Sequence, residues 1–256
     1  MSERERERER ASAVTSSRPP LRPEPQRYQA LALGVSGLAA PAWTAARFGV
    51  DSLGPAATMS MRGAALVSML FGGRLSSGND ADAAKDGFVW TAATYWILRG
   101  AQGAAAARMR TWALVMAVFA ARESGGLWNT ITSADTSVLN RLLPADYDAS
   151  IRNFVGGQML GWGLALLLRP AMVTSMMGIK ASTDLITKML AVNNLVMGGR
   201  CVGGNDSDAA SNGVLFFGGW TVLLTLASQA GAVSGQYVLP LQIWNLASAA
   251  YCFSQR

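Results

Sequence analysis

One acidic motif occurs twice in the chain, and its spacing is close to that of a calcium-binding loop. The copies read GNDADAAKDG (residues 78–87) and GNDSDAASNG (residues 204–213). A calcium loop of the EF-hand type needs oxygen ligands at alternate positions and a closing glutamate, whereas alanines follow the carboxylates here. The alternative is that Asn or Asp caps a helix and that the next Asp is favoured by the helix dipole. Helix caps or weak cation ligands are therefore expected at Asn79, Asp80, Asp82, Asn205, Asp206 and Asp208.

Groups that commonly carry out catalysis are scarce in the sequence. There is no histidine, and Cys201 and Cys252 lack the CxxC spacing of zinc, haem and redox sites. The apolar runs contain no carboxylate, and no Walker, Rossmann, GxSxG or HExxH motif is present. We therefore expect a protein that is not an enzyme and has no metal or cofactor. The ligand class that the sequence leaves open is a lipid or another hydrophobic molecule.

The composition indicates an integral membrane protein. Charged residues make up 15% of the chain, against about 25% in a typical soluble domain. The segment from Ala209 to Gln255 contains no Asp, Glu, Lys or Arg, and it is long enough for two spanning helices of ~20 residues. The net charge of +6 is scattered at the ends of apolar runs, which argues against nucleic-acid binding because no basic patch forms.

An internal repeat underlies the doubled motif. Residues 72–87 match residues 198–213 at ten of sixteen positions without a gap, at an offset of 126 residues. Upstream the offset becomes 129, so that LGVSGLAAP, ending at Pro41, aligns with WGLALLLRP, ending at Pro170. Such self-similarity is the mark of a duplicated structural unit.

The repeat predicts an all-α integral membrane fold of two parallel four-helix units, with about eight transmembrane helices. The expected divisions are a disordered tail (1–27), repeat 1 (28–121), a polar connector (122–152) and repeat 2 (153–256). Both termini then lie on one side of the membrane, which the excess of Lys and Arg places at the cytoplasm or its equivalent. The sequence does not identify which cellular membrane this is. The expected helices are 28–45, 57–73, 82–98, 106–121, 153–169, 184–199, 208–226 and 236–253.

The repeat also carries a family resemblance. A first helix ending in Pro is followed by Phe48-Gly49 or Met177-Gly178, and then by a short helix ending in Gly-Gly-Arg. This pattern resembles the small four-helix integral membrane proteins grouped as a domain of unknown function. The resemblance implies a fused tandem copy and implies no activity. The chain departs from that family where helix two has a basic-acidic pair, here Arg62-Gly63 and Lys188-Met189.

Polar side chains inside the predicted spans are candidates for a ligand site or a solute pathway. Asn194 aligns with Ser68, so that this position is polar in both repeats. Interhelical hydrogen bonds are the alternative explanation for such groups. The candidates are Asn193, Asn194, Ser68, Gln242 and Asn245.

Basic and aromatic residues near the helix ends suit a membrane interface. Arg62, Lys188, Arg74 and Arg200 could bind lipid headgroups or an anionic ligand, or could simply extend to the interface. Tryptophans near helix ends are typical of interfacial aromatic belts, and we expect that role for Trp90, Trp96, Trp112, Trp220 and Trp244.

Together these features predict a non-catalytic multi-pass membrane protein. Its expected role is that of an accessory or scaffolding subunit of a membrane complex, or of a binder of lipid or another hydrophobic ligand. The alternative is a carrier or channel for a small solute, with its site at the pseudo-two-fold axis near Asn194 and Ser68. The expected partners are membrane lipids and other membrane-protein subunits, and no nucleic acid.

Overall fold

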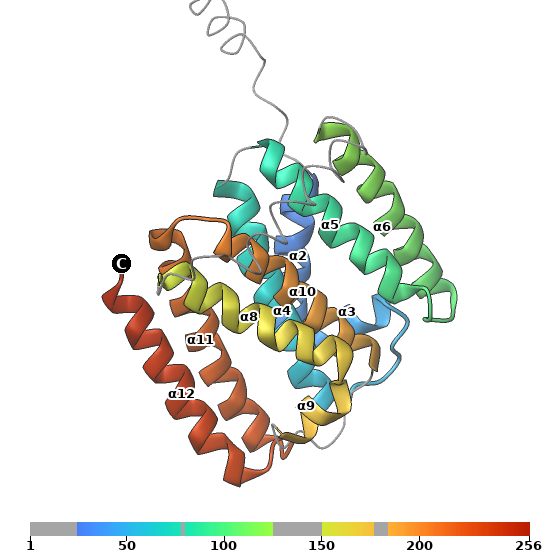
Figure 1. Cartoon of the computed structure of the whole chain (residues 1–256). Coiled ribbons are helices and arrows are strands. Elements are labelled where there is room, and N and C mark those ends of the chain that lie inside the picture. Colours follow the sequence, from blue (N-terminus) through green and yellow to red (C-terminus); the bar gives the residue numbers. More distant parts are fainter. Residues whose placement is uncertain (1–24, 78–79, 125–149, 177–183) are drawn as a thin grey trace, which may run out of the picture.

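Helices make up nearly all of the chain that the computed structural model describes, which is residues 25–77, 80–124, 150–176 and 184–256. The expected all-α class is confirmed for these residues. Figure 1 shows the arrangement. The helices are α2 (Pro25–Ala39), α3 (Pro41–Arg47), α4 (Pro55–Ser77), α5 (Asp80–Leu98), α6 (Ala104–Glu123), α8 (Ile151–Leu168), α9 (Pro170–Met176), α10 (Asp184–Val202), α11 (Asp206–Gln229) and α12 (Gly235–Ser254).

Proline divides the first helix that the sequence predicted. The continuous helix expected over residues 28–45 is wrong, because α2 ends at Ala39 and α3 begins at Pro41. Proline has no N–H to donate and disfavours helical backbone at the residue before it. Accordingly Ala40 has φ −135° and ψ 67°, and Arg169, which precedes Pro170, has almost the same values, φ −140° and ψ 58°.

The long helices pair in two ways. α2 packs along α4, and α8 packs along α10; α5 pairs with α6, and α11 pairs with α12. Helices α4 and α10 pack against each other near the centre of the molecule (Figure 1). In addition, α11 packs more extensively against α4 than against α10, the helix before it in the chain. Likewise, α5 packs more extensively against α10 than against α4, the helix before it. The two parts of the chain are therefore interleaved.

Glycines permit the close approach within the α2–α4 and α8–α10 pairs. A methyl group added to Gly34 would lie 2.6 Å from Cβ of Met69 on α4. One added to Gly163 would lie 2.8 Å from Cγ of Leu195 on α10. Both distances are far below van der Waals contact, so that only glycine fits at these crossings, as in small-residue interfaces of membrane helices.

The second copy of the acidic motif begins a helix. Asn205 precedes α11, and its side-chain oxygen accepts a hydrogen bond of 2.8 Å from the backbone N–H of Asp208. The expected cap is confirmed at this end. The matching prediction for Asn79 falls outside the described residues, as do the side chains of Asp80 and Asp82.

Two of the described helices, α6 and α11, are long and apolar enough to cross a membrane. Core helices of soluble proteins also have this length and composition. The finding is consistent with a membrane location, and the count of eight spans stays a prediction. In α4 and α10, basic side chains such as Arg62 and Lys188 interrupt the apolar sequence.

The outer faces of α6 and α12 expose large apolar side chains. These two helices lie at opposite edges of the molecule (Figure 1). The exposed side chains include Val118 and Phe119 on α6 and Leu239, Ile243 and Phe253 on α12, and Phe253 is 67% exposed. Contiguous apolar patches of this kind mark a surface that meets protein or membrane.

Candidate functional site

Five long helices and one short helix surround a cavity whose lining is mainly apolar and includes five aromatic side chains. It lies between α4, α8, α9, α10, α11 and α12 and has a volume of about 60 Å³. The aromatic lining residues are Trp162, Phe216, Phe217, Trp220 and Trp244, and the polar ones are Ser60, Thr174, Thr187, Asn194 and Asn245. We call this space the aromatic cavity.

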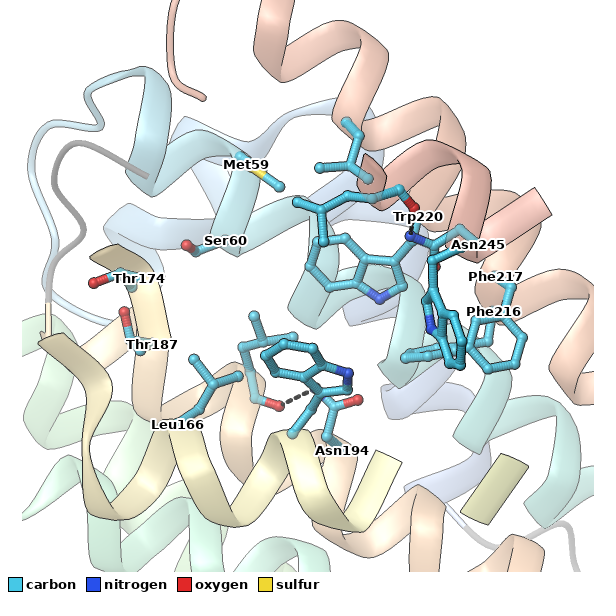
Figure 2. Close-up of a pocket in the computed structure, with 15 residues that line it drawn as sticks. Met59, Ser60, Leu166, Thr174, Thr187, Asn194, Phe216, Phe217, Trp220 and Asn245 are labelled. Atoms are coloured by element: carbon cyan, nitrogen blue, oxygen red, sulfur yellow. Dashed lines mark hydrogen bonds between the residues drawn. The ribbon is translucent and has the colours of Figure 1, made fainter. Parts of the chain in front are cut away.

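The polar side chains are distributed unevenly around the aromatic cavity. In Figure 2, Ser60, Thr174 and Thr187 line one side and the Trp220 indole lies across from them. Asn194 closes a third side. None of the lining residues is charged, so that the cavity is suited to a neutral, largely apolar occupant.

Asn194 has a buried hydrogen-bonding atom without a partner among the described residues. Its side chain is 2% exposed, and its Nδ2 donates a bond of 3.0 Å to the backbone oxygen of Leu190 on the same helix. Its Oδ1 has no partner among the described residues. A buried acceptor without a partner costs about 1–3 kcal/mol, and a ligand that donates to Oδ1 would recover part of that cost.

Asn245 reaches the same cavity from α12. Its Nδ2 donates 2.7 Å to the backbone oxygen of Leu241, in the way that Asn194 bonds to its own helix. Gln242 does not join it, because its amide donates 2.8 Å to the Thr225 hydroxyl on the exposed side of the α11–α12 pair. Of the two polar candidates on the last helix, only Asn245 lines the aromatic cavity.

Asn193, the neighbour of Asn194, lies in a second and smaller cavity of about 20 Å³. Its Nδ2 donates to the Ser68 hydroxyl and to the backbone oxygen of Ala64, both at 2.8 Å. Its Oδ1 accepts 3.0 Å from the Trp90 indole N–H. All of these bonds are buried, and they tie α10 to α4 and α5. The Asn193 amide therefore uses both donor hydrogens and its acceptor.

The structure separates Asn194 from Ser68, which the sequence alternative placed at one site. Ser68 lies with Asn193 in the smaller cavity, and Asn194 lies in the aromatic cavity. The sequence also missed that tryptophans line both cavities. Trp90 and Trp220 are 3% and 8% exposed, so the interfacial role expected for these two is wrong. Their position well inside long helices was the available signal.

The basic candidates divide into two kinds. Arg74 at the end of α4 forms an ion pair with Asp208 on α11. Arg200 at the end of α10 pairs with Asp86 on α5, with 3.3 Å between Nη1 and Oδ2. Arg62 borders a separate cleft between α4 and α11, and the half-buried Lys188 lies on α10. These positions place Arg74 and Arg200 in links between helices.

The carboxylates of the second motif also have partners. Asp208 accepts from the Asn205 side-chain amide at 2.8 Å as well as pairing with Arg74. Asp206 Oδ1 accepts from the backbone N–H of Arg152 at 3.2 Å. Within the described ranges, no group of three or more His, Cys, Asp or Glu residues could hold a metal ion. These contacts favour the capping interpretation of the motif.

Fold and site together define an all-helical protein with an apolar, tryptophan-lined cavity. No protein-family model matches the chain, and neither does any curated protein or solved structure. The resemblance to four-helix membrane proteins therefore stays a prediction, and the function must be argued from the residues.

Proposed function

We propose that this chain is a multi-pass integral membrane protein, built from two parallel four-helix repeats, that binds a lipid or another hydrophobic molecule in the aromatic cavity. The observation that carries the proposal is the buried, unpartnered Oδ1 of Asn194 within that apolar lining. Natural binding sites commonly combine an apolar wall with a few polar groups that fix the ligand's orientation.

The proposed repeats are supported by contacts at corresponding positions. Gly34 and Gly163 are 129 residues apart, and their contact residues Met69 and Leu195 are 126 apart. These are the two offsets of the sequence repeat. The pairing of α2 with α4 has its counterpart in α8 with α10, and α5 with α6 has its counterpart in α11 with α12.

The proposed membrane location is supported by charge and exposure together. Helices α11 and α12 contain no charged residue after Asp208. α12 nevertheless exposes Leu239, Ile243 and Phe253. Contact of such a face with lipid chains has no energetic penalty, whereas its exposure to water is unfavourable.

Site-specific labelling tests the membrane proposal. Both native cysteines are buried, so single cysteines would be introduced at the exposed positions Gly203, Ala230 and Gln102 in a chain with both native cysteines changed to alanine. An impermeant maleimide applied to sealed vesicles should label Ala230→Cys and Gln102→Cys from one side, and Gly203→Cys from the other. Labelling of Gly203→Cys and Ala230→Cys from the same side would refute a spanning α11.

Ligand binding is favoured over transport along the α4–α10 contact. Two polar groups at that contact, the Asn193 amide and the Ser68 hydroxyl, bond to each other. A solute that passed between these helices would have to break the buried hydrogen bonds that Asn193 makes with Ser68, Ala64 and Trp90. The aromatic cavity offers an acceptor without such competition.

Filling the cavity tests the binding proposal directly. Leu190 is 4% exposed and lines the cavity, so Leu190→Phe would occupy part of the space. Leu215 is 57% exposed on α11, which makes Leu215→Phe the matched control. Each protein would be purified in mild detergent, and its bound small molecules would be measured by mass spectrometry.

The expected result is one species bound to the wild type and to Leu215→Phe and depleted from Leu190→Phe. Equal amounts in all three proteins would refute binding in the aromatic cavity. Co-purifying proteins in the same preparation would support the accessory-subunit role, for which the exposed faces of α6 and α12 supply the surface.

A further inference from the structure

The two cavities lie at corresponding positions of the sequence repeat but differ in their polar groups. Asn194 of the aromatic cavity corresponds to Ser68 of the smaller one, and Phe216 corresponds to Trp90, each pair 126 residues apart. Both cavities thus place a side chain with an acceptor oxygen at one equivalent position.

In the smaller cavity, the acceptor at this position is already satisfied from within the chain. The Ser68 hydroxyl accepts an N–H from Asn193 at 2.8 Å, and the same amide accepts from the Trp90 indole. The residue that corresponds to Asn193 in the other repeat is Val67, which has no donor. The Asn194 acceptor accordingly has no partner among the described residues.

We infer that Asn194 makes the aromatic cavity selective for a neutral apolar molecule with one O–H or N–H donor, and that each chain binds one such molecule. The inference rests on the proposed function and specifies its ligand. The Asn193–Ser68 bond shows the kind of contact that the ligand supplies, an N–H or O–H donated to the oxygen at this position.

Size and charge restrict the ligand further. A volume of about 60 Å³ is roughly four to six times the 10–15 Å³ that one water molecule needs. Only the donor-bearing end of a ligand fits such a space, and the rest of the ligand extends out among the helices or lipid chains. An ammonium donor is disfavoured because the cavity has no carboxylate to balance it. Hydroxylated lipids and N–H heteroaromatic compounds share the required chemistry.

Photolabelling of the full chain in lipid nanodiscs tests this selectivity. The probes are a long-chain alcohol with a diazirine near its hydroxyl, and the methyl ether of the same molecule, which has the oxygen but no donor. Cross-linked peptides are mapped by mass spectrometry. We expect the alcohol to label peptides that contain Trp162 or Trp220 about tenfold more than the ether does, as one buried hydrogen bond allows.

Asn194→Leu keeps the apolar volume and removes the acceptor. In this variant the alcohol and the ether should label the same peptides equally. Competition with indole and 1-methylindole distinguishes the two ligand sources: stronger competition by indole than by its methyl derivative identifies N–H heteroaromatics, and competition only by alcohols identifies hydroxylated lipids.

Equal labelling of the wild type by alcohol and ether would overturn the inference while leaving hydrophobic binding intact. No labelling of the cavity by either probe would refute the proposed function itself. Labelling of Trp90 peptides as strong as that of Trp220 peptides would overturn the single-site part of the inference. The wild-type comparison alone decides these outcomes, so they do not depend on the folding of a variant.

Discussion

Two adjacent asparagines on α10 should differ in how much the same substitution destabilises the fold. Asn193→Leu removes three buried hydrogen bonds, to Ser68, Ala64 and Trp90. Asn194→Leu removes one bond to Leu190 within its own helix and also removes the unpartnered Oδ1. The two side chains are nearly equally buried, at 7% and 2% exposure, so burial alone predicts no difference between the variants.

The magnitude follows from the number of groups left without a partner. Interhelical hydrogen bonds in membrane proteins contribute about 0.6 kcal/mol each on average, so that loss of three gives about 2 kcal/mol. The orphaned Trp90 N–H adds up to about 1–3 kcal/mol. We therefore expect Asn193→Leu to lower the free energy of unfolding by about 3–5 kcal/mol, the sum of these two contributions. Asn194→Leu should change it by less than about 1 kcal/mol, or raise it, because an unsatisfied acceptor is removed.

Equilibrium unfolding in mixed micelles, followed by tryptophan fluorescence, measures both variants under one condition. Trp90→Phe provides a further control, since it deletes the donor to Asn193 Oδ1. In the double variant the two losses should add to less than their sum, because the residues share one bond. Equal destabilisation by Asn193→Leu and Asn194→Leu would refute the conclusion that the Asn193 amide is fully hydrogen-bonded and that the Asn194 oxygen lacks a partner.

Two further predictions concern the packing between helices. Gly34→Ala should destabilise the fold by about 1–3 kcal/mol because the new methyl group meets Met69 at 2.6 Å. Gly161→Ala is the control and should be neutral or stabilising, because a methyl group there has nothing within 4 Å. Thermal unfolding measures both variants, and equal melting temperatures would contradict the close α2–α4 contact. Arg74→Asp should lower the free energy of unfolding by about 1 kcal/mol, since its partner Asp208 is 43% exposed. Adding Asp208→Arg should restore part of that loss. No recovery in chemical unfolding would show that the ion pair contributes nothing to stability.

The positions of the long helices could be predicted from the sequence, but the partners of each helix could not. Apolar runs and the repeat placed the expected helix over 184–199 close to α10, Asp184–Val202. The repeat pattern ends its first helix at Pro41, but the expected bounds of 28–45 ran past this proline because an apolar sequence continues on both sides of it. Periodicity says nothing about which helices meet, and the interleaved packing of α11 on α4 follows from contacts far apart in the chain.

The candidate site was predicted in its residue types and not in its grouping. Polar residues inside apolar helices pointed to Asn193, Asn194 and Asn245. The alignment of Asn194 with Ser68 suggested one shared site, but equivalent positions of a repeat lie in equivalent places rather than in the same place. Which asparagine is satisfied depends on the facing helix, and a single sequence does not show that.

A duplicated sequence can place different side chains at equivalent positions, and position 193 on α10 is an example. In the proposed repeats, Asn193 has no polar counterpart because Val67 stands at the corresponding position. The Asn193 side chain lines the smaller cavity, and its hydrogen bonds join α10 to α4 and α5. The aromatic cavity lacks such a side chain, and Asn194 retains its acceptor there. The two cavities thus differ in whether the side-chain oxygen at the equivalent positions 68 and 194 has a partner among the described residues. Under the proposed function, the Asn194 oxygen is the one that a ligand would use.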